Sequence, residues 1–396
     1  VGRDLAPADA ANLPHTQAVA IVTELGGPTS HTALLARGIG IPAVVGAADI
    51  LDVPEGTRIL VDGTTGEIII NPTDALAVGA ITAPVKVTSL TKPGATKDNR
   101  HIELLANIGT PTDAAAAAEA GAEGIGLFRT EFAYLGRDTE PTVTEQAESY
   151  RQVMSAFTQT GTAPQTGAAT VEPIDPAAAK TSPHVVIRTL DAGSDKLLKF
   201  LNLPAEDNPA LGVRGYRTAK IHPDVLKRQL EAIAAGAPDA WVMAPMIATP
   251  EEADAFATLA RVSYGLKTVG VMVETPAAAL MAPELYDIVD FVSIGTNDLT
   301  QYTFAADRLE AELQELQDPG RPALLRLIKA IGDAATRANK PLGVCGEAAR
   351  NPELAPILVG LGVTSLSMAP RALAGVADAL SALTFTDCAA RASARL

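Results

Sequence analysis

Short apolar runs separated by glycine-rich turns dominate the first part of the chain. They lie at residues 19–22, 43–45, 59–62 and 68–70, with one helix-like stretch over residues 32–37. Apolar runs of this length, bounded by turn residues, predict strands. Residues 1–75 are therefore expected to form a small α/β domain. Residues 76–100 lose the pattern and become rich in Ala, then in Thr, Lys, Pro and Gly, which predicts a linker.

Eight further apolar runs follow, and helix-like stretches separate most of them. They lie at residues 103–107, 124–128, 185–189, 241–246, 269–273, 291–294, 342–344 and 365–368. Near-continuous apolar strands that alternate with helices imply a parallel sheet buried on both faces. Eight such units predict a (β/α)8 TIM barrel over residues 101–396, with an open doubly wound sheet as the alternative. Residues 158–183, rich in Thr, Ala, Pro and Gly, interrupt the alternation and predict a surface loop.

Side chains capable of chemistry gather at the carboxyl ends of these predicted strands. In a barrel the carboxyl ends form one rim, and active sites are built there. The residues at or just past a strand end are Arg129, Arg188, Glu274, Asn297, Asp298, Cys345 and Glu347.

Arginines at such a rim suit an anionic ligand. Arg129 and Arg188, together with Arg308 farther along the chain, can hold a phosphate and a carboxylate by charge-assisted, forked hydrogen bonds. The alternative is that the arginines pair with the nearby Glu131 or Asp191.

Two carboxylates, Glu274 and Asp298, follow neighbouring predicted strands. Two oxygen ligands, completed by substrate and water, are the usual way in which proteins hold Mg2+. Asn297 can donate to a phosphate, whereas capping of the next helices is the alternative role for the carboxylates. The residues alone favour core packing for Cys345, with proton exchange as the alternative.

His31 is the histidine with the most distinctive surroundings. It follows a Gly-Gly turn and a Thr-Ser pair suited to N-capping, and it precedes an apolar helix-forming stretch. Free backbone N–H groups and the positive end of a helix dipole favour an anion at such a place. Imidazole is a competent nucleophile near neutral pH, so His31 is a candidate acceptor of a phosphoryl group, with a structural role as the alternative.

Composition narrows the class of partner. The 396 residues are 47% hydrophobic and 19% charged, with a formal net charge of -15, which is typical of a globular protein. The acidic charge argues against nucleic acid, because phosphate backbones are bound by clustered Lys and Arg. We find no secretory signal and no membrane-spanning run, and we expect a cytoplasmic protein without membrane insertion. Val1 stands where an initiator Met is usual, so a processed or truncated product is expected.

Five motifs, in order along the chain, resemble a known family. Residues 26–37 (GGPTSHTALLAR) are similar to the phosphohistidine signature of the phosphoenolpyruvate-utilising enzymes. Residues 126–132 (GLFRTEF), 273–277 (VETPA), 294–302 (IGTNDLTQY) and 345–347 (CGE) resemble Enzyme I of the bacterial phosphoenolpyruvate:sugar phosphotransferase system. The resemblance covers almost the whole chain.

The resemblance implies a small swivelling phosphohistidine domain followed by a TIM barrel that binds phosphoenolpyruvate. It implies transfer of the phosphoryl group to His31 and then to the carrier protein HPr for sugar uptake, with Mg2+ required and a homodimer formed through the barrel. By motif position, Cys345 would be the proton donor and Glu274 and Asp298 the Mg2+ ligands. The positions implied to bind phosphoenolpyruvate are Arg129, Arg188, Asn297, Asp298 and Arg308, and Lys196 and Arg214 match further charged positions.

One part of the family pattern is missing. The helical HPr-binding segment that precedes the phosphohistidine segment in Enzyme I has no counterpart here, so we do not expect this chain alone to recognise the carrier. Two other functions remain open: a fragment of an enzyme like pyruvate phosphate dikinase or phosphoenolpyruvate synthase, and a regulatory remnant that binds phosphoenolpyruvate without catalysis.

Overall fold

A computed structural model describes residues 1–3, 18–26, 33, 36, 41–63, 65–74, 76, 89–135, 137–158, 183–193, 198–308 and 310–396. By its contacts the chain divides into two compact units. One comprises Val1–Val87 with Phe304–Asp318, and the other comprises Thr88–Thr303 with Pro319–Leu396. The limits predicted for the phosphohistidine domain, the linker and the barrel stay predictions.

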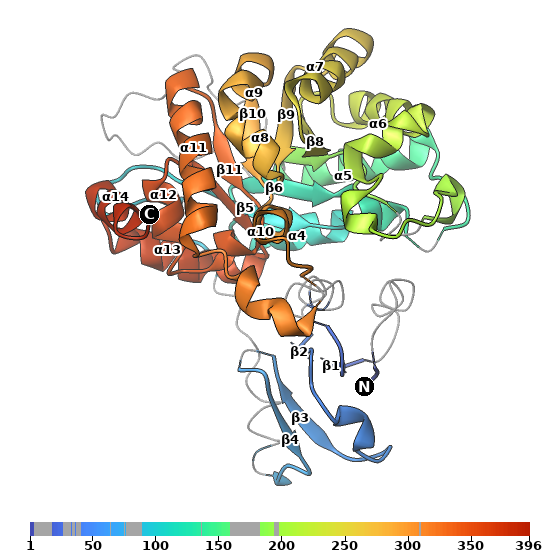
Figure 1. The fold of residues 1–396 in the computed structure, drawn as a ribbon, viewed down its shortest axis with the longest axis vertical. Helices are drawn as coiled ribbons and strands as arrows, with labels where there is room; N and C mark the ends of the chain where they lie inside the picture. Colours follow the sequence, from blue (N-terminus) through green and yellow to red (C-terminus); the bar gives the residue numbers. More distant parts are fainter. Residues whose placement is uncertain are drawn as a thin grey trace. The chain divides into compact units, whose positions relative to one another are not determined.

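The larger unit is a closed barrel of eight parallel strands (Figure 1). In chain order the strands are β5 (Glu103–Ile108), β6 (Gly124–Arg129), β7 (His184–Arg188), β8 (Trp241–Ile247), β9 (Thr268–Val273), β10 (Phe291–Ile294), β11 (Leu342–Val344) and β12 (Ser365–Met368). Each strand pairs with the next, and β12 pairs back onto β5 with Ser365 opposite Glu103. This last pairing confirms the TIM barrel and excludes the open sheet.

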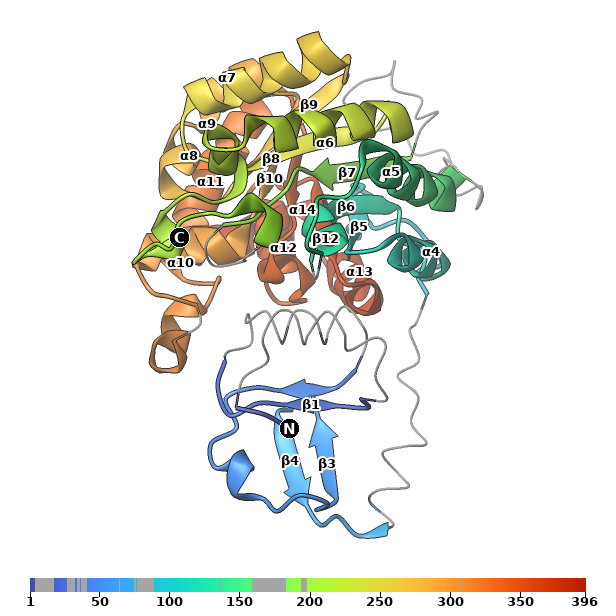
Figure 2. The same cartoon turned by 90° about the vertical axis from the view of Figure 1, so that its right-hand side faces the viewer.

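Helices surround the barrel (Figure 2). They are α4 (Pro111–Glu119), α5 (Val143–Thr158), α6 (Pro223–Gly236), α7 (Pro250–Thr258), α8 (Pro276–Leu280), α9 (Ala282–Ile288), α10 (Thr296–Phe304), α11 (Pro322–Ala338), α12 (Ala355–Gly360), α13 (Leu373–Ser381) and α14 (Phe385–Ser393). A Thr-Pro pair opens three of them, at Thr110, Thr249 and Thr275, and each threonine side chain accepts a hydrogen bond from a backbone N–H of the first turn. Threonine caps the free N–H groups and proline fixes the first helical φ, so these turns end the preceding loop at a defined residue.

The smaller unit contains two short two-stranded sheets. Strands β1 (Ile21–Val22) and β2 (Ala43–Val44) run parallel, whereas β3 (Ile59–Asp62) and β4 (Glu67–Ile70) form an antiparallel pair. These are the four strands that the apolar runs predict. Most of the helix predicted over residues 32–37 lies outside the described residues. The loop predicted over residues 158–183 also lies outside them, apart from Thr158, which ends α5, and Pro183.

In the described part of the chain, no single helix is both long and apolar enough to cross a membrane. One bent pair, residues 370–381 with residues 385–393, meets the test by length and composition only.

Close helix packing leaves no room for a side chain at Gly332. A Cβ atom on Gly332, within α11, would overlap the carbonyl oxygen of Leu361, whereas a Cβ on Gly375 in α13 would meet only Pro352 at 3.9 Å. In a helix Gly→Ala normally stabilises by about 1 kcal/mol. We expect Gly375→Ala to raise the free energy of unfolding by about that amount, and Gly332→Ala to lower it by at least about 2 kcal/mol because backbone must move. Urea unfolding of both variants measures the difference, and equal effects would contradict the packing described.

Candidate active site

The structure places most of the predicted site residues at one end of the barrel strands. Arg129 and Arg188 are the last residues of β6 and β7, and Glu274 directly follows β9. Asp298 lies in the first turn of α10, just past β10, and Cys345 directly follows β11. These positions come from five strands, so the rim gathers side chains that lie far apart in sequence.

Arg188 is buried between two carboxylates. Its Nη2 lies 2.7 Å from Glu131 Oε1 and its Nη1 lies 3.2 Å from Asp191 Oδ2, so the alternative of pairing within the rim holds for this arginine. Burial acts to lower the pKa of Arg188, but Glu131, Asp191 and Glu274 raise it above its ordinary value. Its Nε is buried without a hydrogen-bond partner among the described residues. That N–H group is a donor that an anionic ligand can use.

Arg129 stands close to the same charges. Burial lowers its pKa below the ordinary value, with Glu131 opposing and Arg188 adding to the decrease. Arg129 is half-buried and lies opposite Arg188 on the neighbouring strand. The two guanidinium groups repel each other, and an anion bound between them relieves the repulsion.

A cluster of carboxylates lies beside the arginines. Arg214 is 1% exposed, and its Nη1 lies 3.0 Å from Asp298 Oδ1 while its Nη2 lies 3.7 Å from Asp191 Oδ2. Glu274 Oε1 accepts a hydrogen bond of 2.7 Å from the backbone N–H of Met246. Burial, with repulsion from Asp298 and Asp191, raises the pKa of Glu274 from 4.5 to about 8, although Arg188 and Arg214 oppose the rise.

The carboxylate oxygens suit a hard divalent cation. Among the described residues no group of three or more His, Cys, Asp or Glu side chains is arranged to hold a metal ion. Glu274 and Asp298 form a smaller set, and Mg2+ is commonly held by one or two carboxylates with waters and substrate phosphate. Burial, and then the negative charge of Asp298 and Asp191, raise the pKa of Glu274, and a bound cation would favour its charged form. The residues present therefore fit Mg2+ as a two-carboxylate site.

Cys345 is held by backbone contacts at the edge of the core. It is 2% exposed and packs with Val186, Met243 and Met272. Cys345 therefore takes part in core packing, which is the role that the residues alone favour. Its carbonyl accepts a hydrogen bond of 3.0 Å from Asn107 Nδ2. Burial raises the pKa of the Cys345 thiol above 9.0. The side chain is thus a protonated thiol near neutral pH, which is the form that can donate a proton.

Three of the predicted residues are not placed at this rim by the structure. His31 and Lys196 lie outside the described residues. Arg308 belongs to the smaller unit, so its presence beside the other arginines stays a prediction. Asn297 does reach the rim, and its Oδ1 accepts a hydrogen bond of 2.9 Å from the backbone N–H of Glu347.

Several residues that support the site carry no clear sequence signal. Asn107 donates a hydrogen bond to the carbonyl of Cys345. Its place at the end of a predicted strand is the feature of the sequence that could have indicated this contact. Tyr302 donates to Ala210 O and also receives a hydrogen bond of 3.4 Å from Arg214 Nη1. Met246 has φ 59° at the residue whose N–H binds Glu274, an unfavourable conformation for a side chain of its size.

The pattern of the whole chain matches two family models. The model of the PEP-binding domain of PEP-utilising enzymes matches residues 86–166 and 171–385, and the model of the mobile domain of the same enzymes matches residues 1–66. The chain belongs to the phosphoenolpyruvate-utilising enzymes. The family resemblance is thereby confirmed, and His31 falls within the mobile-domain match.

Curated relatives match most or all of this chain at moderate identity. The phosphoenolpyruvate-protein phosphotransferase of Streptomyces coelicolor is 47% identical over 403 residues, covering 100% of this chain and 68% of that protein. The protein of the same name from Staphylococcus carnosus is 40% identical over 390 residues, covering 93% of this chain and 64% of the relative. The multiphosphoryl transfer protein of Rhodobacter capsulatus is 40% identical, with 94% of this chain and 44% of the relative covered. This phosphoenolpyruvate-utilising chain thus spans between 44% and 68% of the length of these relatives.

Proposed function

We propose that this chain takes the phosphoryl group of phosphoenolpyruvate onto His31 and that the barrel rim is the phosphoenolpyruvate site. The observation that carries the proposal is the meeting of the half-buried Arg129 and the buried Arg188 with the buried carboxylates Glu274 and Asp298 at one end of a barrel. A ligand that suits the two arginines carries several negative charges. A ligand that also suits the two carboxylates can bind the same cation as they do. Phosphoenolpyruvate, with its phosphate and carboxylate, has this chemistry, and it is the substrate class of the family.

The arginines would position the substrate and stabilise its charge. Guanidinium groups bind phosphate and carboxylate through parallel hydrogen bonds, which fixes orientation as well as binding. The unpaired Nε of Arg188 supplies one such donor. Mg2+ held by Glu274 and Asp298 would neutralise charge on the phosphoryl oxygens during transfer. Positioning and charge neutralisation account for most of the catalysis expected in phosphoryl transfer.

Cys345 would complete the conversion to pyruvate. When the phosphoryl group leaves, the remaining enolate needs a proton on its terminal carbon. The thiol of Cys345 is buried at the rim and carries its proton near neutral pH, so it can supply that proton.

His31 is the acceptor in this proposal. It lies in the segment that matches the mobile domain of the family, and the proposal requires that this segment bring the imidazole to the rim. A carrier protein would then take the phosphoryl group from His31. HPr is the carrier that the family resemblance implies, and a homodimer through the barrel and a cytoplasmic location belong to the same proposal.

Labelling with phosphoenolpyruvate tests the function directly. After incubation with Mg2+ and phosphoryl-labelled phosphoenolpyruvate, we expect an acid-labile, alkali-stable label on the chain, as a phosphohistidine gives. His31→Ala should remove the label, and the matched control His15→Ala should retain it. Binding of phosphoenolpyruvate without any label would favour a non-catalytic binding protein, and label on His31→Ala would exclude His31 as the acceptor.

A further inference from the structure

The Glu274 carboxylate lies in a narrow slot between two backbone segments. Its Oε1 atom accepts a hydrogen bond of 2.7 Å from the backbone N–H of Met246. Its Oε2 atom lies against Gly295, because a Cβ atom on that glycine would stand 2.7 Å from Oε2 and 3.0 Å from the Glu274 Cβ. One oxygen is thus held by a donor, and the other occupies a space that a larger residue at position 295 would fill.

A β-bulge in β8 turns the Met246 N–H toward this carboxylate. Residues 244–247 of β8 lie opposite residues 271–273 of β9, so β8 has one residue more than its partner here. Such an extra residue interrupts the ladder and re-aims the groups beside it. Pro245, which has no N–H group and suits a bulge within a sheet, directly precedes Met246. The Met246 N–H is thereby directed to Glu274, which follows the end of β9.

The bulge keeps Met246 in a left-handed conformation. Its φ is 59° and its side chain is 1% exposed. A residue of this size takes such a conformation at a cost, and the conformation persists only where the surrounding structure requires it. Gly215 supplies that surrounding, because a Cβ atom there would stand 2.8 Å from both Cβ and Cγ of Met246. Gly215 is itself anchored, since its N–H donates to Ala192 O at 2.9 Å and its carbonyl accepts from Thr218 Oγ1 at 2.8 Å.

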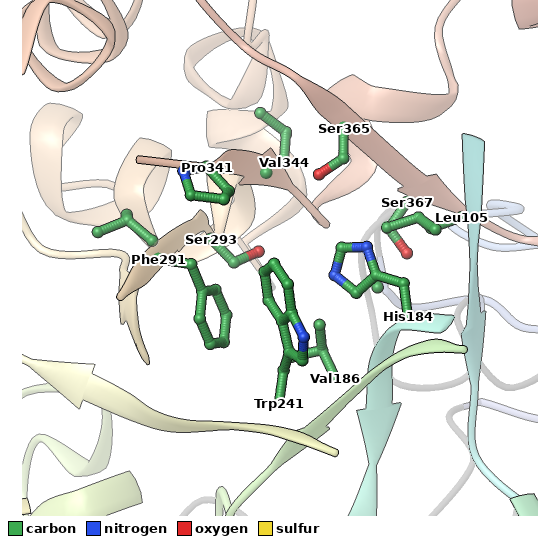
Figure 3. Close-up of a pocket in the computed structure, with 13 residues that line it drawn as sticks. Leu105, His184, Val186, Trp241, Phe291, Ser293, Pro341, Val344, Ser365 and Ser367 are labelled. Carbon is green, nitrogen blue, oxygen red and sulfur yellow. The ribbon is translucent and has the colours of Figure 1, made fainter. Parts of the chain in front are cut away.

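The cavity inside the barrel is a separate space. It has a volume of about 300 Å3, including the part open to solvent. Among the described residues, its lining includes His184 and Trp241, which Figure 3 shows, but not Glu274. Gly343 also lines it, and a Cβ atom there would stand 2.9 Å from Ser365 Oγ. A change at Gly343 therefore fills a gap in the barrel without entering the slot around Glu274.

We propose that the backbone of Met246 and Gly295 positions Glu274 as a ligand of Mg2+, with Oε1 held by the Met246 N–H and Oε2 left to meet the cation. This rests on the proposed function, in which Glu274 and Asp298 hold Mg2+. Gly295 stands three residues before Asp298, so one short segment confines the first carboxylate and carries the second. Met246 and Gly295 act through Glu274, so they are positioning residues.

Removing one N–H group tests the proposal. In the full chain, Met246 is replaced by the α-hydroxy acid that has the methionine side chain, which turns the backbone N–H into an ester oxygen. The side chain is kept, but the donor to Glu274 Oε1 is lost. We expect the affinity for a divalent cation to fall about tenfold or more, as loss of a group that orients a metal ligand usually gives.

The matched control is the same replacement at Met281. That N–H also donates to a carbonyl, Ala277 O at 3.1 Å, but it lies at the end of α8 and the Met281 side chain is 36% exposed. The affinity should change there by less than about twofold, as is usual for changes away from a site. The probe is Mn2+, which prefers the same oxygen ligands as Mg2+. Free Mn2+ is measured by electron paramagnetic resonance, without phosphoenolpyruvate.

Two substitutions separate positioning from packing. Met246→Gly keeps the N–H group and takes the left-handed backbone without strain, although it removes a buried side chain and should lower stability to urea. Its affinity for Mn2+ should stay within about threefold of that of the unaltered chain. Gly295→Ala fills the space beside Oε2 and should lower the affinity about tenfold. Gly343→Ala, which fills the separate cavity, should change it by less than about twofold.

Two results would overturn the positioning role alone. The first is an unchanged Mn2+ affinity in the ester-containing chain while Glu274→Gln weakens binding. The second is an equal loss in Met246→Gly and in the ester-containing chain, because side-chain packing would then explain both.

Failure of the metal site itself would give a different result. If the unaltered chain binds no Mn2+, or if Glu274→Gln leaves the affinity unchanged, Glu274 is not a ligand. The proposed Mg2+ site would then be wrong, and the positioning role with it.

Discussion

Replacing Glu274 with Gln will make the chain more stable and unable to accept phosphate from phosphoenolpyruvate. Glu274 is 2% exposed and lies near Asp298 and Asp191, which is why its pKa is raised to about 8. Glutamine keeps the oxygen that accepts from Met246 N but carries no charge. The variant therefore removes an unfavourable buried charge and, with it, one proposed ligand of Mg2+.

The sign of the pH effect follows from the direction of the shift. Between the ordinary pKa of 4.5 and the folded pKa of about 8, the unfolded chain binds fewer protons at Glu274 than the folded chain does. Stability therefore falls as pH rises through this window and stays low above it. At pH 7 the loss is on the order of 3 kcal/mol, and Glu274→Gln should recover a similar amount.

Urea unfolding at pH 5 and pH 8, without and with Mg2+, measures the effect. We expect the gain in stability of Glu274→Gln to be larger at pH 8, and we expect Mg2+ to stabilise the unaltered chain but not the variant. Glu284→Gln, an exposed change in α9, is the control for loss of one negative charge. Equal stabilisation of both chains by Mg2+ would exclude Glu274 as a ligand.

Arg188→Lys will lower the rate at which the chain takes the phosphoryl group from phosphoenolpyruvate (its loading) about 100-fold or more, although the positive charge at residue 188 is kept. Arg188 contacts Glu131 and Asp191 at the same time and has a further N–H group available. A lysine ammonium group cannot contact both carboxylates and a substrate anion in the same forked geometry. We also expect some loss of stability, because one buried carboxylate is left with a weaker partner.

The matched control is Arg261→Lys, in a second ion pair that lies away from the rim. Arg261 Nη2 lies 2.8 Å from Asp290 Oδ2, just before β10 begins. This change should alter loading by less than about twofold, as changes at partly exposed pairs usually have small effects. Rates of loading measured at several phosphoenolpyruvate concentrations distinguish weaker binding from slower transfer. Loading by Arg188→Lys at the unaltered rate would contradict the assignment of Arg188.

The sequence was sufficient to predict the barrel because its strands are buried on both faces. Such strands appear as short, nearly continuous apolar runs, and the turn residues between them mark where each one ends. The same apolar runs also predicted which side chains gather at the rim formed by the carboxyl ends of the strands. Arg188 and Glu274 stand at strand ends, and parallel strands bring their carboxyl ends to one edge.

The partners of these side chains could not be predicted in the same way. Arg214 and Asp298 are 84 residues apart, and no local pattern indicates that they meet. The left-handed backbone of Met246 likewise depends on how neighbouring strands pack. The sequence left two roles open for Arg188: binding an anionic ligand, or pairing with Glu131 or Asp191. It could not decide between them, because sequence separation does not determine which charged side chains share a buried space.

The most direct measurement locates the phosphoryl group after a single turnover. The chain is mixed with Mg2+ and less than one equivalent of phosphoenolpyruvate, pyruvate is counted, and a digest prepared at alkaline pH is analysed for phosphorylated peptides. We predict one pyruvate for each phosphoryl group and that the phosphate lies on the peptide that contains His31. Pyruvate with free phosphate, or phosphate on another residue, would contradict transfer to His31.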